Sequence, residues 1–207
     1  MSKVILFNFN GTIVNTRSLA IDIYNEIAEK KGYKKINEEE VPYLSTLSIT
    51  DRCKRLNIPM HKLLIIGITI KQRYQKYIPN LNSVNGLNEV IHELKQKGYR
   101  LGFLTTNSRD VTKQFLTRNS INIFDYTHYS FNPFSKSKDI STFLKRNKVN
   151  KKDVIYIGDE IRDIRAAKKN QLCCAAVTWG YDSIKLLNSA DYVAQHPTDI
   201  LKIVSEL

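Results

Sequence analysis

The chain has 207 residues, of which 42% are hydrophobic and 25% are charged, and these proportions exclude a collagen-like chain, a disulfide scaffold and a wholly disordered protein. Its length suggests one large domain or one domain with an insert. Lysine and arginine number 32 against 20 aspartates and glutamates, a net charge of +12, which is compatible with nucleic acid, an anionic membrane or a phosphorylated small molecule as partner.

The chain opens on a short apolar run, residues 4–7, that ends in a polar turn containing Gly11. Such a run is typical of a strand buried on both faces. From residue 16 to about residue 80 every convincing pattern is helical, and turn-prone residues bracket this stretch on both sides. We therefore predict an all-helical cap, residues 15–81, which is hinged at these brackets. It should lie over the carboxyl edge of the sheet because it follows the loop of the first strand.

The rest of the chain alternates between strands and helices. Further strands are predicted at residues 101–104, 154–157 and 173–177, with a weaker candidate at 124–129. Apolar residues at helical spacing lie between them, and Ser108 is a candidate helix N-cap. The alternation predicts an α/β fold, a Rossmann-like doubly wound parallel sheet with its site where the strand ends converge. Residues 1–14 and 82–207 would form this core.

Polar loops follow the first two predicted strands of the core. Asn8 and Asn10 project to the same side, and Gly11 permits a sharp turn and a close approach of the backbone to a ligand. Thr105 and Thr106, followed by Asn107, offer hydroxyl and backbone N–H groups that suit a phosphate or another oxyanion.

Two later loops carry charge. Lys136 precedes a helix, and its spacing to Asp159 favours it over Lys138 as a site residue. Asp159 and Asp163 are four residues apart and would share one side of a starting helical turn. Carboxylate oxygens beside phosphate ligands suit Mg²⁺, although two aspartates at a helix N-terminus are also favoured by the helix dipole alone.

In this order and at this spacing, the four loops resemble the motifs of the haloacid dehalogenase (HAD) superfamily, specifically its phosphoglycolate-phosphatase-like branch with a small helical cap. The resemblance extends over essentially the whole chain and includes Val-Asn-Gly at residues 84–86 and Val-Thr-Trp-Gly at residues 177–180. It implies a HAD-like core and a Mg²⁺-dependent phosphomonoester hydrolase that acts on small phosphorylated metabolites or releases inorganic phosphate.

The resemblance also implies a role for each site position. Position 8 would be an aspartate nucleophile and position 10 an aspartate acid/base, while Thr105 would bind the transferring phosphoryl group. Lys136 would pair with the nucleophile and the phosphate. Gly11, Thr106 and Asn107 would line the substrate site. Mg²⁺ would be held by position 8, the main-chain carbonyl of residue 10 and Asp159, with support from Asp163.

This chain departs from the pattern at its most important positions, because Asn8 and Asn10 replace both catalytic aspartates and Asn15 replaces a third common one. An amide is a far weaker nucleophile than a carboxylate, and Mg²⁺ loses an anionic ligand. We expect the chain to be nearly inactive and its Mg²⁺ binding to be weakened. The alternative is a non-catalytic pseudo-phosphatase that binds a phospho-ligand or regulates another process. Both natural and engineered origins of the asparagines are compatible with the sequence.

The remaining predictions follow from the distribution of residues along the chain. Cys53, Cys173 and Cys174 form a poor disulfide pattern and favour a reducing compartment. The apolar run at residues 63–70 is far shorter than the roughly 20 residues that cross a bilayer. We expect a cytoplasmic protein without a membrane segment. The basic residues between 136 and 169 are not interleaved with aromatic side chains, which disfavours nucleic acid as a partner. The oligomeric state is not predicted.

Overall fold

A computed structural model describes residues 3–130, 132 and 135–206, so that residues 1–2, 131, 133–134 and 207 lie outside the described part. Within that part, six parallel strands form one sheet in the order β3-β2-β1-β4-β5-β6. This arrangement confirms the predicted α/β fold with a Rossmann-like parallel sheet. The strands are β1 (Val4–Asn8), β2 (Arg100–Thr105), β3 (Tyr126–Tyr129), β4 (Val154–Gly158), β5 (Cys173–Val177) and β6 (Tyr192–Ala194).

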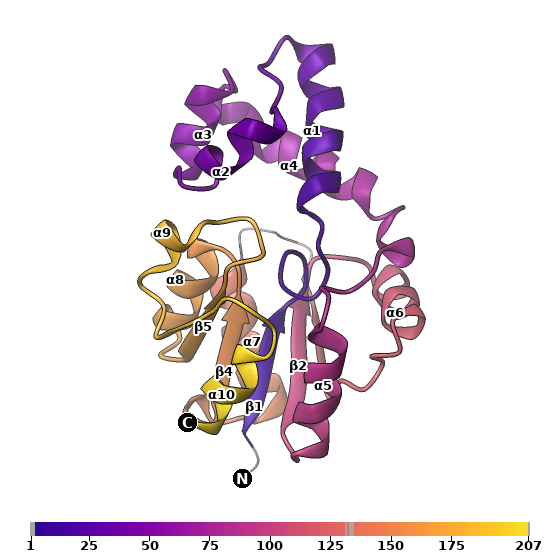
Figure 1. Cartoon of the computed structure of the whole chain (residues 1–207), viewed down its shortest axis with the longest axis vertical. Coiled ribbons are helices and arrows are strands. Elements are labelled where there is room, and N and C mark those ends of the chain that lie inside the picture. Colours follow the sequence, from indigo (N-terminus) through magenta and orange to yellow (C-terminus); the bar gives the residue numbers. More distant parts are fainter. Residues whose placement is uncertain (1–2, 131, 133–134, 207) are drawn as a thin grey trace.

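Helices connect the strands and form the insert after β1 (Figure 1). In the insert they are α1 (Arg17–Lys31), α2 (Val41–Leu44), α3 (Ile49–Arg55) and α4 (Leu63–Tyr74). Around the sheet they are α5 (Leu87–Gln96), α6 (Arg109–Arg118), α7 (Lys136–Asn147), α8 (Ile161–Lys169), α9 (Ile184–Leu187) and α10 (Asp199–Ser205). Short 3₁₀ helices lie at Glu38–Glu40, Met60–Lys62, Ile78–Asn80 and Lys151–Asp153.

Both faces of the sheet are buried, which explains why its strands are continuous apolar runs. Alternate residues of β1 point to opposite faces. Ile5 and Phe7 pack in one cluster with side chains of α5, α6 and α10, while Val4 and Leu6 pack in another with side chains of α7 and α8. A sequence of this kind cannot leave either face to water, so the helices must cover both.

The helices α1–α4 gather beyond the carboxyl ends of the strands, away from both chain termini (Figure 1). They share a separate apolar cluster that includes Tyr24, Leu44 and Ile66. The two connections to the sheet lie side by side, because Val14 forms an isolated antiparallel bridge with Ser83. No helix in the described part of the chain is long and apolar enough to cross a membrane.

The structure also differs from the sequence-based expectation in its elements. Strand β6 was not predicted, because its three residues are too few for a periodic pattern. Strand β3 begins at Tyr126 rather than at residue 124. Ser108 is the N-cap of α6 as predicted, and its hydroxyl accepts a hydrogen bond from the Val111 N–H.

Candidate functional site

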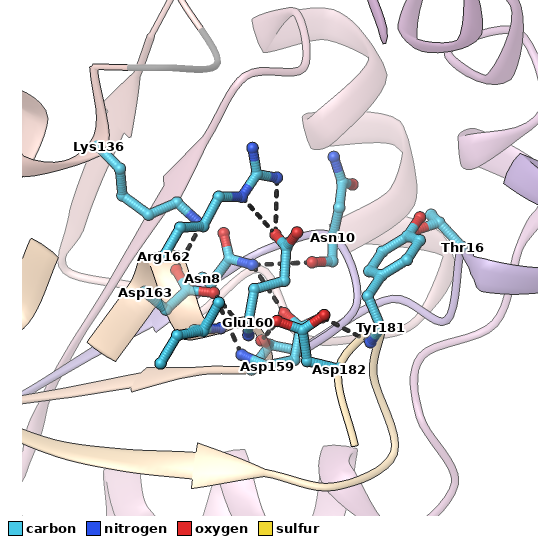
Figure 2. A network of polar contacts seen from close by, with 12 residues as sticks. Asn8, Asn10, Thr16, Lys136, Asp159, Glu160, Arg162, Asp163, Tyr181 and Asp182 are labelled. Carbon is cyan, nitrogen blue, oxygen red and sulfur yellow. Dashed lines mark hydrogen bonds and ion pairs between the residues drawn. The ribbon is translucent and has the colours of Figure 1, made fainter. Parts of the chain in front are cut away.

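The candidate site lies where the central strands end, because β1 has β2 on one side and β4 on the other. Asn8 is the last residue of β1, Thr105 the last of β2, and Asp159 directly follows β4. All three side chains are buried. Parallel strands deliver their carboxyl ends to one edge of a sheet, which is where open α/β folds bind ligands. Most of the predicted site residues therefore converge (Figure 2).

Asn8 joins two parts of the site through its side-chain nitrogen. Its Nδ2 donates to the main-chain oxygen of Asn10 at 2.8 Å and to Oδ1 of Asp159 at 2.9 Å (Figure 2). An amide nitrogen carries two hydrogens, so both are used in these contacts. Asn8 therefore acts here as a hydrogen-bond donor toward two oxygens.

Asp159 is fully buried and accepts hydrogen bonds from three donors on two segments of the chain. Besides Asn8, the Thr12 hydroxyl donates to its Oδ1 at 2.8 Å and the Tyr181 backbone N–H donates to its Oδ2 at 3.0 Å. Burial, and then the neighbouring charges of Glu160 and Asp163, raise the pKa of Asp159 to about 7. The three donors favour the charged form.

Gly11 is required beside this carboxylate for two reasons. Its φ is +82°, in the left-handed region, where a side chain is disfavoured. A Cβ atom at this position would also lie 2.1 Å from Oδ2 of Asp159. The backbone of the first loop can therefore approach Asp159 only because residue 11 lacks a side chain.

Lys136 and Asp163 form an ion pair on another side of the site, where α7 begins. Asp163 is 1% exposed, and its oxygens also accept hydrogen bonds from the Tyr156 hydroxyl at 2.9 Å and the Glu160 backbone N–H at 3.0 Å. Asp163 therefore positions Lys136 and the start of α8. Lys138 is exposed, so the structure places Lys136, rather than Lys138, at the site.

Asn10 contacts both the sheet core and the insert of helices α1–α4, which we call the cap from here on. Asn10 and Asn107 form a reciprocal amide pair, with N–O distances of 2.9 and 3.3 Å, and Asn10 Nδ2 also lies 2.9 Å from the Tyr74 hydroxyl of α4. Burial raises the pKa of Tyr74 to about 12, so this hydroxyl stays neutral. The Asn107 backbone N–H donates to the Thr105 hydroxyl at 3.1 Å within the loop after β2, and the Asn10–Asn107 pair connects this loop to the loop after β1.

A second cap contact lies at Asp182, in the loop after β5. Arg52 of α3 forms an ion pair with Asp182, and the same carboxylate accepts a hydrogen bond from the Ile161 N–H at 2.8 Å. Burial raises the pKa of Asp182, and the Arg52 guanidinium opposes this. A single carboxylate thus holds α3 of the cap against the start of α8.

We expect Arg52→Ala to lower the free energy of unfolding by about 3 kcal/mol, because it leaves the buried Asp182 carboxylate without its cation. Urea denaturation would measure the loss. Arg55→Ala is the matched control: Arg55 pairs with Glu40 at 3.2 Å, but its side chain is 51% exposed, so its removal should have a far smaller effect. Equal losses in the two variants would contradict the role given to Asp182.

Three oxygens could hold a divalent cation: a carboxylate oxygen of Asp159, the main-chain oxygen of Asn10 and Oδ1 of Asn8. The last would face the cation only if the Asn8 amide were flipped, so that Oδ1 and Nδ2 exchanged places. As arranged, these groups do not fit one, because the Asn8 amide hydrogens face the other two oxygens. The described residues also contain no cluster of three acidic, histidine or cysteine side chains suited to a metal.

Several residues of this network could not be recognised from the sequence. Thr12, Tyr74, Tyr156 and Tyr181 look like ordinary loop or packing residues in the sequence. Thr12 directly follows Gly11 and Tyr181 directly follows Gly180, so a glycine in each loop was the signal that the sequence offered, and a Cβ at either glycine would clash with Asp159. The site offers a lysine cation, the Thr105 hydroxyl and neutral amides, and these groups suit an anionic ligand. It has no carboxylate at position 8 or 10.

Comparison with known proteins gives a consistent result. Residues 5–177 match the family described as haloacid dehalogenase-like hydrolase. The chain is 27% identical over 208 residues to a phosphoglycolate phosphatase of Synechococcus elongatus, covering 99% of this chain and 98% of that protein.

Solved structures share the fold. A predicted phosphatase from Clostridium acetobutylicum superposes with a TM-score of 0.79 at 21% identity, covering 100% of both chains. A mutant of CbbY from Rhodobacter sphaeroides, in which an aspartate is replaced by asparagine, was crystallised in complex with xylulose-(1,5)bisphosphate. It superposes with a TM-score of 0.69 at 21% identity over 96% of both chains.

Proposed function

Because this chain belongs to the haloacid dehalogenase-like hydrolase family, in its phosphoglycolate-phosphatase-like branch, we propose that it binds small phosphorylated metabolites and hydrolyses them very slowly at most. The observation that carries this proposal is the pairing of Asn8 with Asp159 and of Asn10 with Asn107. Both asparagines are hydrogen-bonded within the site, where the family pattern implies a nucleophile and an acid/base.

The proposed roles follow from the chemistry of each group. Lys136 and the Thr105 hydroxyl hold the phosphoryl group, and the loops that contain Gly11, Thr106 and Asn107 surround it. The amide of Asn8 is a poor nucleophile at phosphorus. Asn10 can neither give nor take a proton, which by itself costs on the order of 10²–10⁴-fold in rate.

The same substitutions favour ligand binding. A carboxylate at position 8 would repel a phosphate dianion in the ground state, whereas a neutral amide does not. The asparagine-substituted CbbY structure with its bound bisphosphate supports the idea that this fold retains a phospho-ligand when one of its aspartates is replaced by asparagine. We also propose that Mg²⁺ binds this chain weakly, because one anionic ligand is missing.

A non-catalytic role is the alternative, in which the bound ligand regulates another process. The reciprocal amide pair of Asn10 and Asn107 favours it, since an aspartate at position 10 would replace a donor by an acceptor in that pair. Under this alternative the asparagines are functional residues.

Inorganic phosphate tests the proposed pocket directly by isothermal titration calorimetry. We expect Lys136→Gln to weaken phosphate binding roughly tenfold to a hundredfold, because a charged hydrogen bond is lost. Glutamine can still donate to Asp163, which limits damage to the fold. Lys138→Gln removes an exposed lysine two residues away and should bind like the unaltered chain. Equal weakening by both variants, or no binding by the unaltered chain, would refute the pocket.

A further inference from the structure

The nitrogen of the Asn8 side chain lies between two oxygens of the site. It lies 2.8 Å from the main-chain oxygen of Asn10 and 2.9 Å from Oδ1 of Asp159. Main-chain and carboxylate oxygens are the hard ligands that Mg²⁺ takes, and here the amide hydrogens satisfy both. Figure 2 shows the amide of Asn8 directed at these two groups.

We propose that the Asn8 amide takes the place of the divalent cation, so that this chain folds and binds phosphate without Mg²⁺. Only one part of this proposal, that phosphate binds without Mg²⁺, rests on the phosphate pocket proposed above. Its structural part, that the site needs no metal for stability, stands on the hydrogen bonds of Asn8 alone.

The surroundings of Asp159 support this inference. A fully buried carboxylate needs compensation by donors or by a cation. In this structure Asn8, Thr12 and the Tyr181 N–H supply three donors, two from the end of β1 and its loop and one from the loop after β5. A cation that bound Oδ1 of Asp159 and the oxygen of Asn10 would have to displace the amide hydrogens from both.

An aspartate at position 8 would place a hydrogen-bond acceptor, instead of the present donor, beside Asp159. It would replace the donor nitrogen by an oxygen about as far from Asp159 as the present 2.9 Å, so that two buried carboxylates would face each other. Like charges at this distance repel strongly. The site would then require a cation to be stable. The effect of Mg²⁺ on stability should therefore depend on which residue stands at position 8.

Thermal unfolding in EDTA and in excess Mg²⁺ tests the structural part. We expect Mg²⁺ to leave the unfolding midpoint of the unaltered chain unchanged. Asn8→Asp should unfold at a lower temperature in EDTA, and Mg²⁺ at a hundredfold excess over its dissociation constant should raise that midpoint by about 5–10 °C. Asn15→Asp adds the same charge at an exposed position and should not respond to Mg²⁺.

Mg²⁺ stabilisation of the unaltered chain equal to that of Asn8→Asp would overturn the proposal, as would an Asn8→Asp variant that folds but does not respond to Mg²⁺. If that variant does not fold, electron paramagnetic resonance of Mn²⁺ added to the unaltered chain decides the question, and a tightly bound Mn²⁺ would refute the proposal.

Phosphate calorimetry completes the test. The unaltered chain should bind inorganic phosphate equally well in EDTA and in Mg²⁺, and binding only in Mg²⁺ would overturn the inference. Absence of phosphate binding under both conditions would refute the proposed function, whereas the unfolding comparison would still decide whether Asn8 replaces the cation.

Discussion

The double substitution Asn8→Asp with Asn10→Asp should convert this chain into an active phosphatase. In the presence of Mg²⁺, hydrolysis of an aryl phosphate such as p-nitrophenyl phosphate should rise by at least about 10⁴-fold over the unaltered chain. The variant regains a carboxylate nucleophile and an acid/base group, and the second alone contributes on the order of 10²–10⁴-fold. Release of nitrophenolate, followed by its absorbance, measures the gain.

Two controls make this result specific. Adding Lys136→Gln to the double variant should remove most of the gained activity, because the proposed phosphate partner is lost, whereas adding Lys138→Gln should not. Robust turnover by the unaltered chain would refute the inactivity assigned to Asn8. If neither the unaltered chain nor the double variant hydrolyses a broad panel of phosphate esters, the regulatory alternative gains support.

The sheet could be predicted from the sequence because its strands are buried on both faces. A run such as Val4–Phe7 has no polar face, and parallel strands between covering helices are the arrangement that accepts it. The order of the site loops followed from the same pattern. Strand β6 was missed because Tyr192–Ala194 is too short to show any periodicity.

The contacts around the loops could not be predicted. Tyr74 of α4 contacts Asn10 although the two residues are 64 positions apart in the chain. Such a contact depends on how the helices α1–α4 pack against the loops of the sheet. The spacing of Asp159 and Asp163 suggested that both belong to one metal site. In the structure, Asp163 contacts Lys136, Tyr156 and backbone N–H groups, whereas Asp159 accepts a hydrogen bond from Asn8, and the metal role of both stays a prediction.

The single substitution Asn8→Asp should separate the two halves of the reaction. In Mg²⁺, the new carboxylate oxygen should form a bond to phosphorus while the bond from phosphorus to the nitrophenolate oxygen breaks. Nitrophenolate leaves as a stable anion, so this step does not need a proton from residue 10. Attack of water on the resulting phospho-aspartate does need a base, and Asn10 cannot act as one. We expect one equivalent of nitrophenolate in a burst, followed by turnover on the order of 10²–10⁴-fold slower than in the double variant.

Intact-protein mass spectrometry after the burst should show one phosphoryl group per chain in Asn8→Asp and none in Asn10→Asp, which still lacks the nucleophile. Peptide mapping should place that group on residue 8, since Asp159 is fully buried and its two oxygens still accept hydrogen bonds from the Thr12 hydroxyl and the Tyr181 N–H. A phosphoryl group on Asp159 or Asp163 would show that position 8 is not where phosphorus is attacked. Full turnover by Asn8→Asp without a burst would instead show that a group other than residue 10 activates water, and the role proposed for position 10 would then be wrong.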